Sequence, residues 1–118
     1  MQLNEVRYEG ARPVEGYGPG FFRVGGQVFE GRVLLTPEGA QPWDGGAAAL
    51  VALGDTVDVV FLGMGADIAN PPEDLVAALE AAGLGVEIMS SPSACRTYNV
   101  LLGEGRRIAA ALLPVPGA

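Results

Sequence analysis

Three consecutive segments decide the fold: Val57-Asp-Val-Val-Phe-Leu62, residues 70–83, and Val86-Glu-Ile-Met89. The first is almost continuously apolar, which is typical of a strand covered on both faces. The second has the spacing of an amphipathic helix, and the third is a short β-prone run. A strand, a helix and a strand in this order predict a right-handed crossover with two parallel strands.

The predicted helix of residues 70–83 has start and stop signals. Asn70 is placed to cap it ahead of Pro71 and Pro72, and Glu73 stands at the capping-box position. Gly83 ends it. The apolar stripe expected to face the core consists of Leu75, Val76, Leu79 and Ala82.

A second helix and a last strand follow. Ser91 is the expected cap of the helix, with Pro92 at its first position. Its apolar face repeats at Ala94, Tyr98, Leu101 and Leu102. Gly103 and Gly105 stop this helix, and residues 108–113 form a buried strand.

The N-terminal third is β-prone and rich in glycine. Phe21–Val24 and Gln27–Glu30 flank Gly25-Gly26, which predicts a tight hairpin. We therefore expect one domain over residues 1–118, divided into an irregular lead-in (1–20), a small β unit (21–36) and an α/β core (46–114). Trp43, in the loop of residues 37–46, is either a plug over the core or an interface anchor.

Composition excludes several classes of function. The 118 residues carry 14 acids against 7 arginines and no histidine, a formal charge of −7. Such a surface disfavours nucleic acid and anionic membranes. With no histidine and one cysteine, we expect no metal site, and the balance leans away from an enzyme. No apolar run is long enough to insert into a bilayer, so we expect a cytoplasmic protein.

A crevice is predicted at the carboxyl ends of the parallel strands, where ligands gather in open α/β sheets. Gly63, Met64 and Gly65 follow one strand, and Ser91 opens the helix after the next. The N–H groups of that helix would favour an anion, and Arg96 could add positive charge. The alternative is that Gly63–Gly65 is simply a structural turn.

Further polar residues on the helix and after it are candidates for a binding surface: Arg96, Asn99, Glu104 and Arg106. Arg96 could instead pair with Glu104 or Asp67 and have only a structural role. Cys95 is a soft nucleophile without a histidine to activate it, so we expect it to be inert.

The chain resembles a known family over residues ~17–114. The family is one of unknown function that includes a mitochondrial respiratory complex I assembly factor and an adipogenesis-associated cytosolic protein. The segments that carry the resemblance are Gly20-Phe21-Phe22, Val24-x-Gly26, Phe29-x-Gly31, Val33-Leu34, Trp43, Gly63-Met64-Gly65, Ser91-Pro92-x-Ala94, Tyr98-Asn99-x-Leu101, Glu104-Gly105-Arg106 and Ala110–Pro114. Met64 and Ser91 depart from the small polar residue and the threonine that are common at these positions.

The resemblance implies a three-layer α/β fold. Its central sheet would be mixed and five-stranded, with the last strand antiparallel to its neighbours, and a small β-hammerhead-like unit would come from the N-terminal strands. It implies no enzyme activity, cofactor or metal.

Two functional hypotheses follow from the residues and the resemblance. The first is a non-catalytic interaction protein that resembles an assembly factor and contacts a subunit of a membrane-associated complex, as a monomer or weak homo-oligomer. The second is a small-molecule or anion-binding protein, possibly a hydrolase, that uses the crevice.

Overall fold

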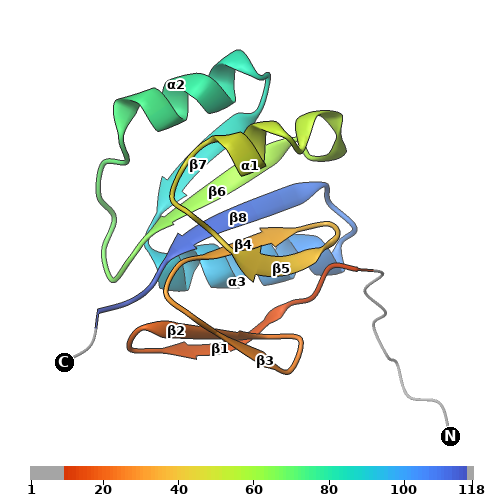
Figure 1. Ribbon diagram of the computed structural model, residues 1–118. Helices are drawn as coiled ribbons and strands as arrows, with labels where there is room; N and C mark the ends of the chain where they lie inside the picture. Colours follow the sequence, from red (N-terminus) through yellow and green to blue (C-terminus); the bar gives the residue numbers. More distant parts are fainter. Residues whose placement is uncertain (1–9, 117–118) are drawn as a thin grey trace, which may run out of the picture.

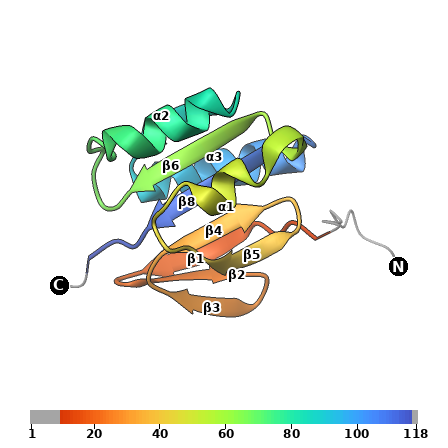
Figure 2. The same ribbon diagram turned by 45° about the horizontal axis from the view of Figure 1, so that its top comes forward.

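The computed structural model describes residues 10–116 of the chain. Its centre is a five-stranded mixed sheet (Figure 1). Helices α1 and α2 cover one face of this sheet, while helix α3 and a separate three-stranded sheet cover the other (Figure 2). The expected three-layer α/β fold, with a five-stranded mixed sheet and a small N-terminal β unit, is confirmed.

The large sheet has the order β5-β4-β8-β6-β7. In that order the strands are Gly39–Pro42, Val33–Thr36, Ile108–Leu113, Val59–Met64 and Gly85–Met89. Strand β8 is antiparallel to β4, as expected, but parallel to β6, so the expectation for the last strand is wrong on that side. The reason is α3, which carries the chain from β7 back across β6 and delivers β8 in the same direction.

The two long helices lie on opposite faces of the sheet. Helix α2 (Glu73–Ala81) connects β6 to β7, and α3 (Ser91–Gly103) connects β7 to β8. Two right-handed crossovers that run in opposite directions along a sheet place their helices on opposite faces. The short helix α1 (Ala48–Val51) and a 3₁₀ turn (Gly54–Thr56) precede β6.

The N-cap of α2 is Pro72 and not Asn70, and no side chain caps it. A proline disfavours helical geometry in the residue before it, so the Pro71-Pro72 pair delays the start of the helix. Within the expected apolar stripe, Leu75 and Leu79 are buried, whereas Ala82 is exposed.

The small sheet has the order β1-β2-β3, formed by Val14–Gly18, Phe21–Val24 and Gln27–Glu30. The hairpin across Gly25-Gly26 is confirmed, and both glycines have a positive φ. The expected boundaries are corrected in two places. A strand begins at Val14, inside the supposed irregular lead-in, and Val33–Thr36 belongs to the large sheet. All four residues of β4 are buried, which requires cover on both faces.

Successive side chains of the central strands point to opposite faces of the sheet, where they form two hydrophobic cores. Phe61 and Ala110 face α3 and the small sheet, while Val60, Leu62, Ala109 and Ala111 face α1 and α2. Trp43 joins the second core with 7% of its surface exposed, and its ring N–H donates to the Gly46 carbonyl at 2.9 Å. The plug interpretation of Trp43 therefore fits better than an exposed anchor.

Candidate functional site

The expected crevice is closed by direct contacts between its two sides. Ser91 is fully buried. Its hydroxyl donates to the Leu113 carbonyl at 2.6 Å and accepts from the Gly65 N–H at 2.9 Å. The Ser91 N–H donates to the Gly65 carbonyl at 2.7 Å. Ser91 thus joins the carboxyl ends of β6 and β8 to the first turn of α3.

Gly63 makes this closure possible because it leaves room for Ser91. A Cβ atom on Gly63 would lie 2.9 Å from Ser91 Oγ and 2.7 Å from Leu112 Cδ2. Met64 is half-buried against the second core, and Gly65 turns the chain with φ +94°. Gly63, Met64, Gly65 and Ser91 are therefore brought together as expected, in a packed junction.

The N-terminus of α3 has no free N–H group to offer an anion. The cap is Ser90, whose hydroxyl accepts from the Ser93 N–H at 3.3 Å, so the expected cap role of Ser91 is wrong by one residue. Pro92 has no N–H, and the Ala94 N–H donates to the Ser90 carbonyl. The anion-binding hypothesis thus loses the donors it would use.

Asn99 attaches the small sheet to α3. Its side chain accepts from the Val14 N–H at 2.8 Å and donates to the Val14 carbonyl at 2.9 Å. The amide therefore pairs with the edge of β1 much as a neighbouring strand would. Val14 stands next to an irregularity in the β1–β2 register, where backbone groups need another partner.

We expect Asn99→Ala to loosen the small sheet and to lower the free energy of unfolding by about 2 kcal/mol, because both Val14 backbone groups lose their partner. Hydrogen exchange at β1 and β2 should accelerate, while β6 keeps its protection. Asn99→Asp, which keeps the acceptor but not the donor, serves as the intermediate control. Unchanged exchange at β1 in Asn99→Ala would contradict the assignment.

Cys95 and Tyr98 are buried on the inner side of α3, with 4% and 1% of their surfaces exposed. Burial raises the pKa of the Cys95 thiol to about 11, although the charge of Arg96 opposes the shift. Burial also raises the pKa of Tyr98 to about 12. Both groups stay protonated and packed near neutral pH, so Cys95 is a poor nucleophile.

The same two groups predict a loss of stability in alkali. Each loses its proton more readily in the unfolded chain, so its contribution is intact below pH 9.0 for Cys95 and 10.0 for Tyr98. The contribution is then lost as the pH rises to about 11 and about 12. Each group should remove about 2–3 kcal/mol from the free energy of unfolding over its own range. Urea unfolding of Cys95→Ala and Tyr98→Phe, compared with the parent chain across this range, should show the lower and the upper part of the loss disappear respectively.

The remaining candidate residues are exposed and lie on α3 or just after it. Arg96 is exposed and its guanidinium donates to Ser93 Oγ at 3.3 Å. Glu104 and Arg106 are exposed beyond the end of α3. A helix of 13 residues rises about 20 Å. Glu104 and Arg106 therefore lie near the amino end of β6, whereas Gly63–Gly65 are at its carboxyl end. Among the described residues, no ion pair joins Arg96 to Glu104 or Asp67.

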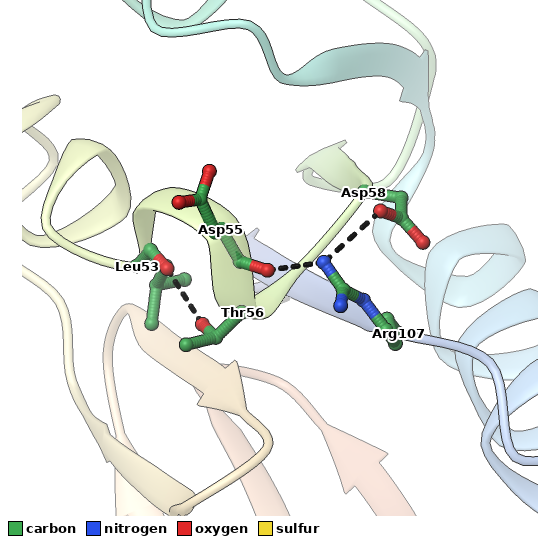
Figure 3. A network of polar contacts seen from close by, with 5 residues as sticks. All are labelled: Leu53, Asp55, Thr56, Asp58 and Arg107. Atoms are coloured by element: carbon green, nitrogen blue, oxygen red, sulfur yellow. Dashed lines mark hydrogen bonds and ion pairs between the residues drawn. The ribbon is translucent and has the colours of Figure 1, made fainter.

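Arg107, the residue after the candidate Arg106, holds the charged corner that follows α3 in place. Its guanidinium lies 3.2 Å from Asp58 Oδ1 and also donates to the Asp55 carbonyl (Figure 3). The Asp58 N–H donates to the Arg107 carbonyl at 2.9 Å. These contacts join the starts of β6 and β8. Both side chains are more than half exposed, so the ion pair itself contributes little stability.

Several open clefts lie elsewhere on the surface, and two of them adjoin the large sheet. One, of about 570 Å³, follows the seam between the two sheets and is lined by Glu30, Gly31, Arg32, Pro42, Trp43, Leu113 and Pro114. The other, of about 420 Å³, runs beside α2 and is lined by Asn70, Pro71, Glu73, Val76, Ala77, Glu80 and Ile88. Within residues 10–116, no three His, Cys, Asp or Glu side chains are grouped to hold a metal ion.

The two-sheet arrangement defines the class of protein, a three-layer Mth938-like α/β domain. A Bordetella pertussis structure described as an Mth938-like domain matches with a TM-score of 0.77 at 26% identity, covering 100% of this chain and 95% of that one. A Bartonella henselae structure described as an outer membrane protein matches with a TM-score of 0.83 at 29% identity, covering 92% of this chain and 99% of that one. The chain belongs to the family described as "Protein of unknown function (DUF498/DUF598)", which matches residues 14–113.

The chain is also similar in sequence to several curated proteins. An uncharacterized protein of Rhodobacter capsulatus is 54% identical, covering 100% of this chain and 97% of the relative. NADH dehydrogenase (ubiquinone) 1 alpha subcomplex assembly factor 3 is 29% identical in Danio rerio and 27% identical in Homo sapiens. These alignments cover 85% and 88% of this chain but only 63% and 61% of the assembly factors. The family resemblance is thus confirmed. Over the described part of the chain, no helix is long and apolar enough to cross a membrane.

Proposed function

We propose that this chain is a non-catalytic, cytoplasmic interaction protein that helps to assemble a membrane-associated complex of the respiratory type. The observation that carries the proposal is the similarity to the vertebrate assembly factors. The similarity covers 85% of this chain for the Danio rerio protein and 88% for the Homo sapiens protein. It therefore extends over most of the domain and is not limited to a single shared motif.

The chemistry of the described side chains supports a binding role over a catalytic one. The chain has no histidine, and Cys95 is buried with a raised pKa. The Ser91 hydroxyl is already hydrogen-bonded to the backbone of Gly65 and Leu113. Activation of a serine or cysteine nucleophile needs an adjacent base or a lowered pKa. The polar residues that remain accessible are suited to contacts with a partner.

The outer face of α3 is the contact surface that we propose. Arg96, Val100 and Glu104 follow each other at helical spacing i, i+4 and i+8, and all three are exposed. Val100 has 60% of its surface exposed, which is high for an apolar residue in a helix. An exposed valine between a cation and an anion provides an apolar centre and charges that can fix the orientation of a partner.

Co-purification from the native host tests this function. The tagged chain should enrich subunits of a respiratory-type membrane complex, and Val100→Glu should abolish the enrichment. Val28→Glu is the matched control, because Val28 is also exposed (48%) but lies on β3. Absence of such subunits with the parent chain would refute the assembly role, while full enrichment with Val100→Glu would refute the α3 surface alone.

A further inference from the structure

Within residues 10–116, strand β7 ends the large sheet with a free edge. Among these residues it pairs only with β6, in an unbroken parallel register from Gly85 to Met89. Figure 1 shows β7 as the outermost strand on the side of α2. A free edge presents unpaired N–H and C=O groups that can accept another strand.

The other edge strands of the described chain are shortened or irregular, as protected edges usually are. Strand β5 has four residues and ends on Pro42, and β3 also has four. Strand β1 has a register irregularity and is occupied by Asn99 at Val14. Strand β7 carries neither a proline nor a bulge.

The 420 Å³ cleft lies between α2 and this edge, and we name it the β7 groove. Its floor is apolar, with Val76 from α2 and Ile88 from β7 both half-buried. The groove-facing stripe of α2 runs from Glu73 through Val76 and Ala77 to Glu80. Both glutamates are exposed, and they stand at the two ends of the apolar floor, seven positions apart.

The charge of the β7 groove is of one sign. Its lining contains Glu73 and Glu80 but no arginine, and the whole chain has a formal charge of −7. A second copy of the chain would bring two acidic grooves together, which like-charge repulsion opposes. The complementary occupant is therefore a basic segment of another protein.

We propose that the β7 groove binds an extended, basic segment of a partner protein, which adds a strand to the edge of β7. Backbone hydrogen bonds would hold the segment, while alternate side chains select it. On the face toward α2, a central apolar residue would pack on Val76 and Ile88, with a lysine or arginine two residues before and after it, near Glu73 and Glu80. This site is separate from α3, on the opposite face of the sheet, and adds a second binding surface to the proposed function.

The probe is a fluorescein-labelled peptide, Gly-Ser-Lys-Thr-Leu-Thr-Lys-Ser-Gly, measured by fluorescence anisotropy against the full chain. We expect saturable binding that weakens with added salt. The double variant Glu73→Gln/Glu80→Gln should bind about tenfold more weakly, because two exposed ion pairs are lost. The control Glu30→Gln/Glu38→Gln makes the same change in net charge at exposed positions outside both the groove lining and β7, and should bind as the parent does.

Strand addition has its own readout. Hydrogen exchange should show new protection within Gly85–Met89 when the peptide is bound, and a peptide N-methylated at alternate residues should not bind. No saturable binding, equal weakening in the control variant, or protection at β3 or β5 in place of β7 would overturn the proposal. Self-association that protects β7 without peptide would also overturn it, since the occupant would then be a second copy. None of these outcomes depends on Val100, so the assembly role and the β7 groove can fail separately.

Discussion

Ser91→Ala is expected to lower the free energy of unfolding by about 2–4 kcal/mol, more than the loss of an ordinary helix cap. The hydroxyl is fully buried and serves two backbone groups, the Gly65 N–H and the Leu113 carbonyl. Alanine leaves both groups without this partner at a position that has no surface exposed to solvent. Urea unfolding followed by the fluorescence of the buried Trp43 gives the measurement.

The neighbouring serine supplies the control for this prediction. Ser90 is the N-cap of α3, and its hydroxyl accepts one hydrogen bond, from Ser93. Ser90→Ala should therefore cost only about 1 kcal/mol. The relative size of the two stability losses shows which serine holds this end of α3. A larger loss for Ser90→Ala would mean that the cap, and not the junction of β6, β8 and α3, holds this end of the helix.

Gly63→Val should be at least as damaging, with a loss of about 3 kcal/mol or more. The new Cβ would lie 3.0 Å from the Ser91 Cα, a backbone atom that cannot move aside without displacing α3. Leu112 Cδ2, at 2.7 Å, is a side-chain end and can yield more easily. The φ of Gly63 is not positive, so lack of space alone causes the effect.

A graded series keeps this prediction measurable even if valine prevents folding. Gly63→Ala should fall between the parent and Gly63→Val in thermal unfolding. Gly103→Ala is the control, because a Cβ there meets no atom within 4 Å and the residue ends α3 without a positive φ. It should leave stability unchanged or raise it by up to ~1 kcal/mol. Equal stability of Gly63→Val and the parent would contradict the packing at the junction.

Much of the fold could be predicted because hydrophobic patterns and glycine turns are local signals. The apolar run that became β6, the stripe of α2 and the Gly25-Gly26 hairpin all depend on neighbours in sequence. The direction of β8 relative to β6 and the place of β4 in the large sheet depend on pairing between distant segments, which no local pattern encodes. For β4, the run of three consecutive apolar residues from Val33 to Leu35 was the available signal of burial on both faces.

The candidate site was harder to predict for the same reason. Gly63, Gly65 and Ser91 do lie together, because the carboxyl ends of parallel strands are at the same end of the sheet. That the Ser91 hydroxyl would face Leu113, and that Asn99 would reach Val14 across 85 positions, cannot be read from the sequence. Glu104 and Arg106 do not share a surface with the glycine turn, because the length of α3 places them near the amino end of β6.

The position of β8 has a consequence for biosynthesis. It lies in the middle of the large sheet, yet every other strand of that sheet precedes it in the chain. During translation the β4–β5 pair and the β6–β7 pair emerge before the strand that joins them, each with an open edge. The two halves of the sheet can pair only after residues 108–113 have left the ribosome. Until then the nascent chain exposes unpaired strand edges, to which chaperones can bind.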